Sequence, residues 1–203
     1  MTTAREAGLL VIADGKRGDV PVSAAAYGQA LFGSTPTPWG SAQGLGADAA
    51  TVNPMLGADS IEPLLAAAEA VGAGVFCLVR TSNPGAADVL DLPAPERPLF
   101  ERLAELVAER ADRLRSESGL SGVGAVVGAT EPRHLGRLRE LMPDAIFLIP
   151  GVGAQGGSVA ALEPALGRLP ASILVTASRS IADARDPAAA AGELRSAVWD
   201  LAG

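Results

Sequence analysis

The sequence contains one lysine, and that lysine lies among acidic residues. Lys16 stands in the stretch Asp14-Gly15-Lys16-Arg17-Gly18-Asp19, whereas every other fixed cation in the chain is an arginine. A lysine can give up a proton and an arginine effectively cannot. Asp14 and Lys16 are two residues apart, so in an extended strand their side chains point the same way. The pattern indicates a cation held beside developing negative charge with a proton to deliver, and the alternative is a charged plug at a strand end.

A second group of residues suits an anion. The loop Pro150-Gly151-Val152-Gly153-Ala154-Gln155-Gly156-Gly157-Ser158 contains four glycines, which let backbone N–H groups approach a phosphate, and a helix N-terminus is expected after it. Arg179 follows the next apolar run and adds a guanidinium suited to bidentate phosphate contact. Together they predict a phosphorylated ligand, with a plain mobile loop as the alternative. The stretch Thr81-Ser82-Asn83-Pro84-Gly85 contains hydroxyl and amide groups that could bind the polar edge of a ligand. The same residues are equally typical of a turn capped by Ser or Asn.

These residues follow short apolar runs that alternate with helical patterns. The predicted strands are 9–14, 49–54, 75–79, 124–128, 145–149 and 173–176, and the first is expected to be buried on both faces. The predicted helices are 23–32, one capped by Ser60, 99–116, 131–141, 159–166 and 187–201. Alternation without a hairpin signal indicates parallel strands with right-handed crossovers.

Almost every predicted strand is followed by polar residues or by glycine at its C-terminal end. A (β/α)8 barrel gathers its site from all strand ends in this way, whereas a doubly wound sheet concentrates its site at one switch point. Six units are two short of closure. We therefore expect an α/β fold, an incomplete TIM barrel, formed by one domain over residues 1–203.

Composition narrows the class of protein. The net charge of −7 argues against nucleic acid, and no apolar run approaches the ~20 residues of a membrane helix. The N-terminus lacks the pattern of a signal peptide. Cys77, the one cysteine, excludes a structural disulfide and fits a reducing cytoplasm. His134 is expected on a solvated helix without a role, and no His or Cys cluster suggests a transition metal. Trp39, Trp199 and Tyr27 are expected in a core or an interface.

Five motifs, in order and at matching spacing, resemble the orotidine 5′-phosphate decarboxylases of the longer bacterial type. They are Asp14 to Val20, Thr51 to Gly57, Arg80 to Ala86, Gly124 to Thr130 and Pro150 to Gly157. The resemblance covers essentially the whole chain. Met55 stands where the family usually has an aromatic residue, which is interpreted as a packing change.

The resemblance implies a lyase that needs no cofactor and no metal. The family removes CO2 from orotidine 5′-phosphate to give UMP, the last step of de novo pyrimidine biosynthesis. It implies that Lys16 protonates the C6 carbanion, that Asp14 lies by the substrate carboxylate, and that Asp19 serves the neighbouring subunit in a homodimer with shared sites. Substrate binding is implied for Ser82 at the pyrimidine edge, for Gln155 and Arg179 at the phosphate, and for Asn53 and Gly153.

The family's first two βα units have no counterpart here. They carry an aspartate for the ribose and a second lysine, so the chain is expected to be an N-terminally truncated barrel whose first strand exposes an unpaired edge. Two alternatives stay open. One is a non-catalytic remnant that binds a phosphorylated ligand. The other is a metal-dependent sugar-phosphate decarboxylase or aldolase of the same barrel group, which shares the Asp-x-Lys-x-x-Asp pattern.

Overall fold

The computed structural model describes residues 1–153 and 155–203, and six of its strands form one sheet. The strand order is β1-β4-β5-β6-β7-β8, and β1 with β4, β4 with β5 and β7 with β8 pair in parallel. The strands are β1 (Ile12–Arg17), β4 (Ala49–Val52), β5 (Gly74–Arg80), β6 (Ser121–Val127), β7 (Ala145–Ile149) and β8 (Ile173–Val175). A closed barrel of this kind has eight parallel strands. The chain is an α/β protein with an incomplete barrel, as the sequence predicted.

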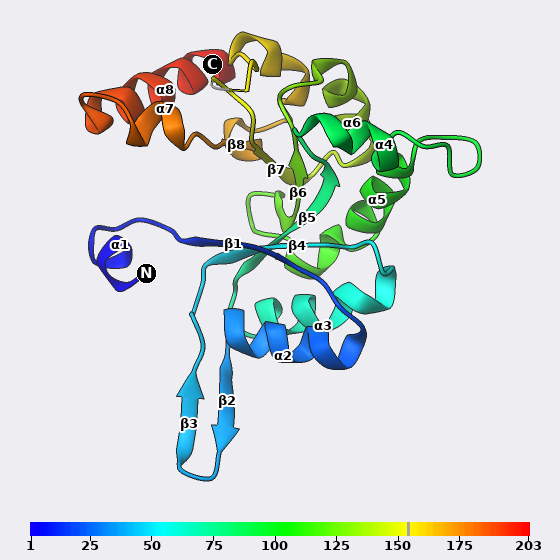
Figure 1. The fold of residues 1–203 in the computed structure, drawn as a ribbon, viewed down its shortest axis with the longest axis vertical. Helices are drawn as coiled ribbons and strands as arrows, with labels where there is room; N and C mark the ends of the chain where they lie inside the picture. Colours follow the sequence, from blue (N-terminus) through cyan, green and yellow to red (C-terminus); the bar gives the residue numbers. More distant parts are fainter. Residues whose placement is uncertain (154) are drawn as a thin grey trace. The chain divides into compact units, whose positions relative to one another are not determined.

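Helices connect these strands (Figure 1). The α-helices are α1 (Thr2–Glu6), α2 (Pro21–Leu31), α3 (Ala58–Glu69), α4 (Ala87–Leu90), α5 (Leu99–Ala108), α6 (Leu135–Leu141), α7 (Arg179–Ala182) and α8 (Pro187–Ala202). Short 3-10 helices are η1 (Pro84–Ala86), η2 (Ala111–Leu114), η3 (Pro132–His134), η4 (Ala160–Ala165) and η5 (Pro170–Ser172). In the stretch expected to be helical over 159–166, Pro164 lies inside η4 and cannot donate a backbone hydrogen bond, so an α-helix is disfavoured there.

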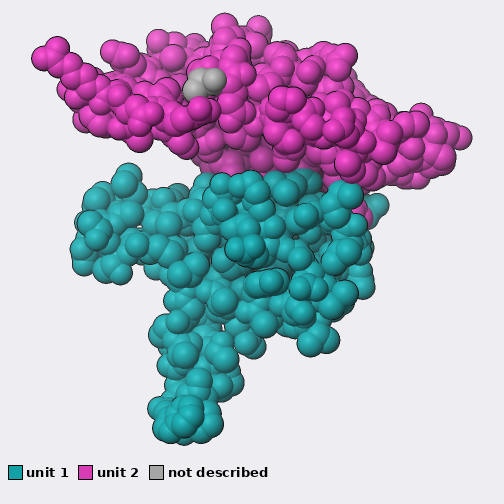
Figure 2. Space-filling view, viewed as in Figure 1, with its two compact units in different colours: residues 1–78, 109–124 teal, residues 79–108, 125–203 magenta. Residues whose placement is uncertain are grey.

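The chain divides into two compact units (Figure 2). Unit 1 comprises residues 1–78 and 109–124, and unit 2 comprises residues 79–108 and 125–203. Fully buried side chains of unit 1 include Ile61, Leu64 and Leu65 of α3 with Val52 and Val75 of the sheet. Those of unit 2 include Phe100, Leu135, Leu138, Phe147 and Ile149. Each unit thus has its own apolar core, and the assignment of one domain to residues 1–203 stays a prediction.

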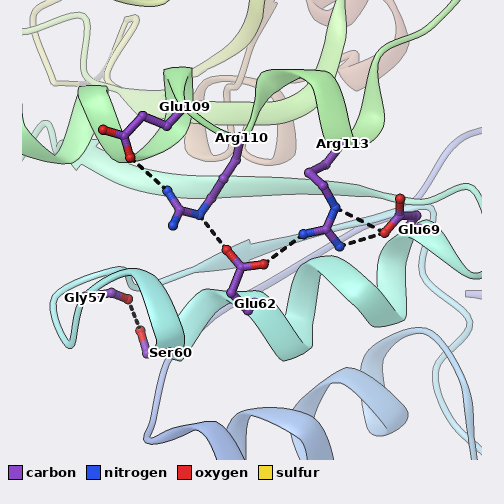
Figure 3. A network of polar contacts seen from close by, with 7 residues as sticks. All are labelled: Gly57, Ser60, Glu62, Glu69, Glu109, Arg110 and Arg113. Atoms are coloured by element: carbon purple, nitrogen blue, oxygen red, sulfur yellow. Dashed lines mark hydrogen bonds and ion pairs between the residues drawn. The ribbon is translucent and has the colours of Figure 1, made fainter.

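Charged side chains tie α3 to the segment around η2 within unit 1 (Figure 3). Glu62 accepts from Arg110 Nε at 2.7 Å and from Arg113 Nη1 at 2.8 Å, and Arg113 Nη2 donates to Glu69 at 2.7 Å. The expected helix over 99–116 ends at Ala108, and the turn that follows aims both arginines at α3. Helix α3 itself begins after Gly57, and Ser60, expected as its cap, donates its hydroxyl to the Gly57 carbonyl from inside the first turn.

One arginine of unit 2 contacts four of its secondary-structure elements. The guanidinium of Arg139, in α6, lies 3.8 Å from the centre of the Phe147 ring. It donates to the backbone carbonyls of Met142, Pro143, Ala145, Ala165 and Ser172. Burial lowers the pKa of Arg139 to about 10. The side chain therefore joins α6, β7, η4 and η5 through their carbonyl groups.

Three expectations about the first fifty residues are wrong. Strand β1 lies three residues later than predicted and is half-exposed, with Leu9 and Leu10 exposed before it. The reason is its place at the end of the sheet, where only β4 pairs with it. A hairpin of β2 (Ser34–Thr37) and β3 (Gly40–Gln43) is present although the sequence showed no hairpin signal (Figure 1). Its turn is closed by Thr37, whose hydroxyl donates to the Gly40 carbonyl at 2.8 Å.

Two tryptophans expected in a core or an interface lie on the surface. Trp39, at the tip of this hairpin, is 93% exposed and Trp199 is 71% exposed, so neither is in a core and the interface stays a prediction. His134, expected on a solvated helix, is half-buried, and its Nε2 atom is buried without a partner among residues 1–153 and 155–203. Its ring lies 4.7 Å from that of Phe100. Cys77 is fully buried, as the apolar run around it predicted.

Candidate functional site

The single lysine is held at the end of β1. Lys16 Nζ lies 2.7 Å from both carboxylate oxygens of Asp14. Thr51, which is buried in β4, donates its hydroxyl to Asp14 Oδ1 at 2.8 Å and accepts the Lys16 backbone N–H at 3.0 Å. The neighbouring strand therefore fixes both the carboxylate and the backbone of the lysine. Asp14 and Lys16 do come together, although a kink in β1 and not their spacing alone brings this about.

The backbone reaches this arrangement in an unusual way. Lys16 has φ of 50°, in the left-handed region, and it is the one non-glycine residue of the described chain with positive φ. The pairing of β1 with β4 shifts register between Ala13 and Arg17. A register shift of this kind re-aims side chains at a sheet edge, and strain of this kind is often kept at functional sites. The ion pair thus depends on a kinked strand and not on the regular alternation that the sequence suggested.

The electrostatics keep Asp14 ionised. Partial burial raises the pKa of its carboxyl, but the hydrogen bonds from Lys16 and Thr51 outweigh that effect and leave the pKa below its usual value. The side chains of Lys16 and Asp14 are 49% and 61% exposed. Water therefore screens this pair, and its strength as a free-standing salt bridge is small. Its value lies in orientation, because contact with both carboxylate oxygens fixes the position of the ammonium group.

Asp19 and Asn53 lie on the segments next to this pair. A Cβ at Gly18 would lie 2.3 Å from the Asn53 carbonyl oxygen, so only glycine allows the two segments to approach. The Asn53 N–H donates to the Arg17 carbonyl at 2.8 Å. The Asn53 side chain accepts the Met55 N–H, and Asp19 accepts the Val20 N–H just before α2. Asp19 is thus placed at the start of a helix and its carboxylate accepts a local bond there.

In unit 2, Ser82 is enclosed by close backbone approaches. A Cβ at Gly128 would lie 2.7 Å from the backbone of Ser82, and one at Gly151 would lie 3.1 Å from the Ser82 Cβ and 3.4 Å from Gln155 Oε1. Thr130 donates its hydroxyl to the Ser82 carbonyl at 3.0 Å. The structure therefore brings together Ser82 and Gln155, two residues predicted to bind substrate. Thr130 and Thr51 received no role from the sequence, although both lie in the motifs that carry the resemblance.

The glycine loop after β7 is folded on itself. The N–H groups of Gly153, Gly156 and Gly157 donate to the carbonyls of Gly157, Gly153 and Gly151 at 2.8 to 3.0 Å. Gly151, Gly153 and Gly156 have positive φ. These three N–H groups are therefore used within the loop and are not free for an anion, and the expected approach of backbone N–H groups to a phosphate stays a prediction for the rest of the loop. Ala154, within the predicted loop, lies outside the described residues.

Arg179 begins α7 beside this loop. A Cβ at Gly153 would come within 3.7 Å of the Ser180 hydroxyl, so the loop touches the first turn of α7. Gly153 and Ser180 both border a cavity of about 270 Å³. The Arg179 side chain is exposed. After the loop the structure has η4 in place of the expected helix, with Ser158 Oγ accepting the Ala161 N–H. The exposed Arg179 thus stands at the start of α7, next to a loop that uses three of its own N–H groups.

Residues 1–153 and 155–203 contain neither a candidate metal centre nor a candidate membrane span. No group of three or more His, Cys, Asp or Glu residues is placed to hold a metal ion. No helix in this described part combines the length and apolar character that crossing a bilayer requires.

The fold and the strand-end residues define an incomplete-barrel protein with a lysine–aspartate pair, with Ser82 and Gln155 both next to Gly151, and with Arg179 at the start of α7. The chain belongs to the Orotidine 5′-phosphate decarboxylase / HUMPS family, whose profile it matches over residues 1–194. The family resemblance read from the five motifs is thereby confirmed.

Named relatives agree with this membership. The orotidine 5′-phosphate decarboxylase of Rhodopirellula baltica is 44% identical over 181 residues, which are 88% of this chain and 58% of the relative. That of Caldicellulosiruptor bescii is 43% identical over 173 residues, which are 85% and 57%. The chain thus spans less than two thirds of the length of the curated relatives it matches.

Solved structures show the same fold. The structure of Leishmania donovani OMP decarboxylase is 35% identical, with a TM-score of 0.75, covering 96% of this chain and 69% of that one. The orotidine 5′-monophosphate decarboxylase of Methanocaldococcus jannaschii, complexed with the inhibitor BMP, has a TM-score of 0.75 over 97% of this chain and 77% of that one. Its identity is 21%, so it supports the fold alone.

Proposed function

We propose that this protein decarboxylates orotidine 5′-phosphate to UMP, with Lys16 as the proton donor. The observation that carries the proposal is the fixed ammonium of Lys16, held by Asp14 and Thr51 in a member of this family. The C6–carboxylate bond breaks and CO2 leaves, so its electron pair stays on C6. The Lys16 ammonium gives C6 a proton, and the resulting amine regains one from water. A fixed cation at the developing charge is the stabilisation that such a carbanion needs.

Asp14 has two roles in this proposal. It orients Lys16, and its negative charge lies where the substrate carboxylate enters, so that the ground state is disfavoured until CO2 departs. The lowered pKa of Asp14 supports both roles, because the carboxyl stays ionised at neutral pH. No cofactor enters this reaction, in keeping with the resemblance.

Substrate binding is proposed for the residues that the resemblance implies. Ser82 would bind the pyrimidine edge, and Gln155 with Arg179 would bind the phosphate. Asn53 and Gly153 are each proposed to contact substrate. Support comes from the approach of Ser82 to Gln155 across Gly151 and from the contact between Gly153 and the first turn of α7. Because three glycine N–H groups are used within the loop, the guanidinium of Arg179 carries most of the expected phosphate affinity.

We also propose a homodimer in which Asp19 serves the partner's site. Asp19 precedes α2, where Val20 and Val22 are 55% and 84% exposed, and an exposed apolar pair beside a functional carboxylate suits a protein interface. We propose in addition that residues 1–203 form one barrel domain that lacks two βα units. A separate proposal concerns localisation, namely that the protein works in the cytoplasm.

The test is a decarboxylation assay followed by ultraviolet absorbance. Lys16→Ala and Lys16→Arg should both abolish turnover, since arginine keeps the charge but cannot deliver the proton. Both variants should still bind UMP. Arg179→Ala should raise KM by about 30-fold, the equivalent of a lost charged hydrogen bond of ~2 kcal/mol, whereas Arg185→Ala serves as the matched control. Turnover by Lys16→Arg at the wild-type rate would refute the role of Lys16.

A second candidate is a non-catalytic protein that binds a phosphorylated ligand. The observation that favours it is the exposure of Asp14 and Lys16, because a charged pair in contact with water loses the electrostatic advantage of a closed site. One experiment distinguishes the decarboxylase from the non-catalytic binding protein. A chain that binds UMP in calorimetry but releases no CO2 from orotidine 5′-phosphate would support the second.

A further inference from the structure

A buried ion pair lies beside the segment that carries Ser82. Arg80, the last residue of β5, is 4% exposed. Its Nε donates to Asp91 Oδ1 at 2.8 Å and its Nη2 donates to Asp91 Oδ2 at 3.1 Å, so the two side chains meet in a two-pronged pair. Such paired contacts fix geometry as well as charge. The hydrogen bonds from Arg80 hold the pKa of Asp91 below its usual value.

The third nitrogen of the same guanidinium holds the backbone next to Ser82. Arg80 Nη1 donates to the Thr81 carbonyl at 2.6 Å, and the Arg80 carbonyl accepts the Gly128 N–H at 2.7 Å. Asp91 directly follows α4, eleven residues along the chain from Arg80. The ion pair therefore closes a loop over residues 81–90, and one guanidinium holds both ends of that loop.

We propose that Arg80 and Asp91 are positioning residues that hold Ser82 in the conformation that reads the base of the ligand. The inference rests on the proposed function, because it names what sets the base recognition of that same site. Neither side chain touches the ligand in this proposal. Arg80 acts through the Thr81 carbonyl and Asp91 acts by keeping the guanidinium in place, so that the Ser82 hydroxyl stays on the pyrimidine edge.

The competing account is that the pair only stabilises unit 2. The two accounts differ in what a replacement by apolar residues should do. Exchange of a buried ion pair for apolar side chains of similar volume is often neutral for stability. The double variant Arg80→Met with Asp91→Leu should therefore fold, but it has no donor for the Thr81 carbonyl. A purely structural role predicts normal ligand binding in this variant, and a positioning role predicts a loss.

The experiment is calorimetric titration of the 203-residue chain with UMP and with ribose 5-phosphate, which lacks the base. The variants are Asp91→Asn and the double variant. The control is Glu101→Gln, which breaks the ion pair between Arg137 and Glu101 on the outer helices of the same unit. We expect UMP affinity to fall about tenfold in both test variants, because the loss of one hydrogen bond to the base is typically worth about tenfold in affinity. Affinity for ribose 5-phosphate should stay within about twofold, and the control should lose neither.

Several results would overturn the inference. Equal losses for UMP and ribose 5-phosphate would show a general structural effect, as would normal UMP binding by the double variant. Equal affinity of the wild-type chain for the two ligands would show that no base is read. If the wild-type chain binds neither ligand, the proposed function fails and the base-reading role fails with it. Hydrogen exchange of peptides 81–90 in Asp91→Asn and Glu101→Gln then separately reports whether the ion pair holds this segment.

Discussion

Gly128→Ala should damage the site through a single methyl group. Gly128 follows β6, and a Cβ there would lie 2.7 Å from the backbone N and Cα of Ser82. Ordinary contact begins near 3.4 Å, so the Ser82 segment must withdraw by about 0.7 Å. The φ of Gly128 is not in the left-handed region, so the backbone itself tolerates alanine. The predicted effect is therefore steric and local.

The Ser82 segment cannot withdraw freely. The Gly128 N–H is bonded to the Arg80 carbonyl, and the Thr130 hydroxyl is bonded to the Ser82 carbonyl. A shift of this size strains both bonds, and overpacking of this kind costs about 1–3 kcal/mol in the free energy of unfolding. A displaced Ser82 leaves the ligand without its hydrogen bond, a loss of about 1–3 kcal/mol, so UMP affinity should fall by about tenfold to 100-fold.

Urea unfolding and UMP titration measure the two effects. The matched control is Gly192→Ala in α8, where an added Cβ meets nothing within 4 Å. There alanine should raise the stability by about 0.5–1 kcal/mol, because glycine is unfavourable inside a helix. If Gly128→Ala is as stable as Gly192→Ala and binds UMP as well as the wild-type chain, then Ser82 is not held against Gly128 and the reasoning is wrong.

Two further predictions concern the stability of unit 2. Arg139→Met should lower the free energy of unfolding in urea by about 3–5 kcal/mol, because buried carbonyl groups lose a charged donor. The control Arg137→Met, at an exposed position, should cost less than about 1 kcal/mol. An equally small loss for Arg139→Met would contradict the role of Arg139 in joining these elements. Burial lowers the pKa of His134, so the folded state resists protonation of its ring. Stability should therefore fall as the pH drops below about 6.5, toward the lower pKa of the folded state. In thermal unfolding between about pH 7 and pH 5, the plot of Tm against pH should be flatter for His134→Gln than for the wild-type chain.

Much of the fold follows from short-range patterns in the sequence. The run Ala145–Ile149 is β7 with the bounds expected, because five consecutive apolar residues suit a strand in a buried sheet. The helix predicted over 187–201 is α8, which begins with Asp186 as its cap and Pro187 in its first turn. The alternation of such elements predicted parallel strands, and the polar residues at the strand ends favoured an incomplete barrel over a doubly wound sheet. The motifs likewise indicated that Asp14, Lys16, Ser82 and Gln155 belong to functional segments.

Other features depend on contacts between residues far apart in the chain. Thr51 is 35 positions from Lys16, and Thr130 is 48 positions from Ser82. Nothing in the local sequence indicates that Lys16 adopts a left-handed backbone, or that the glycine loop uses its own N–H groups. Local propensity determined which elements form and in which order. Only the packed structure decided which side chains meet, because those distances depend on strand pairing and on close approaches that glycine permits.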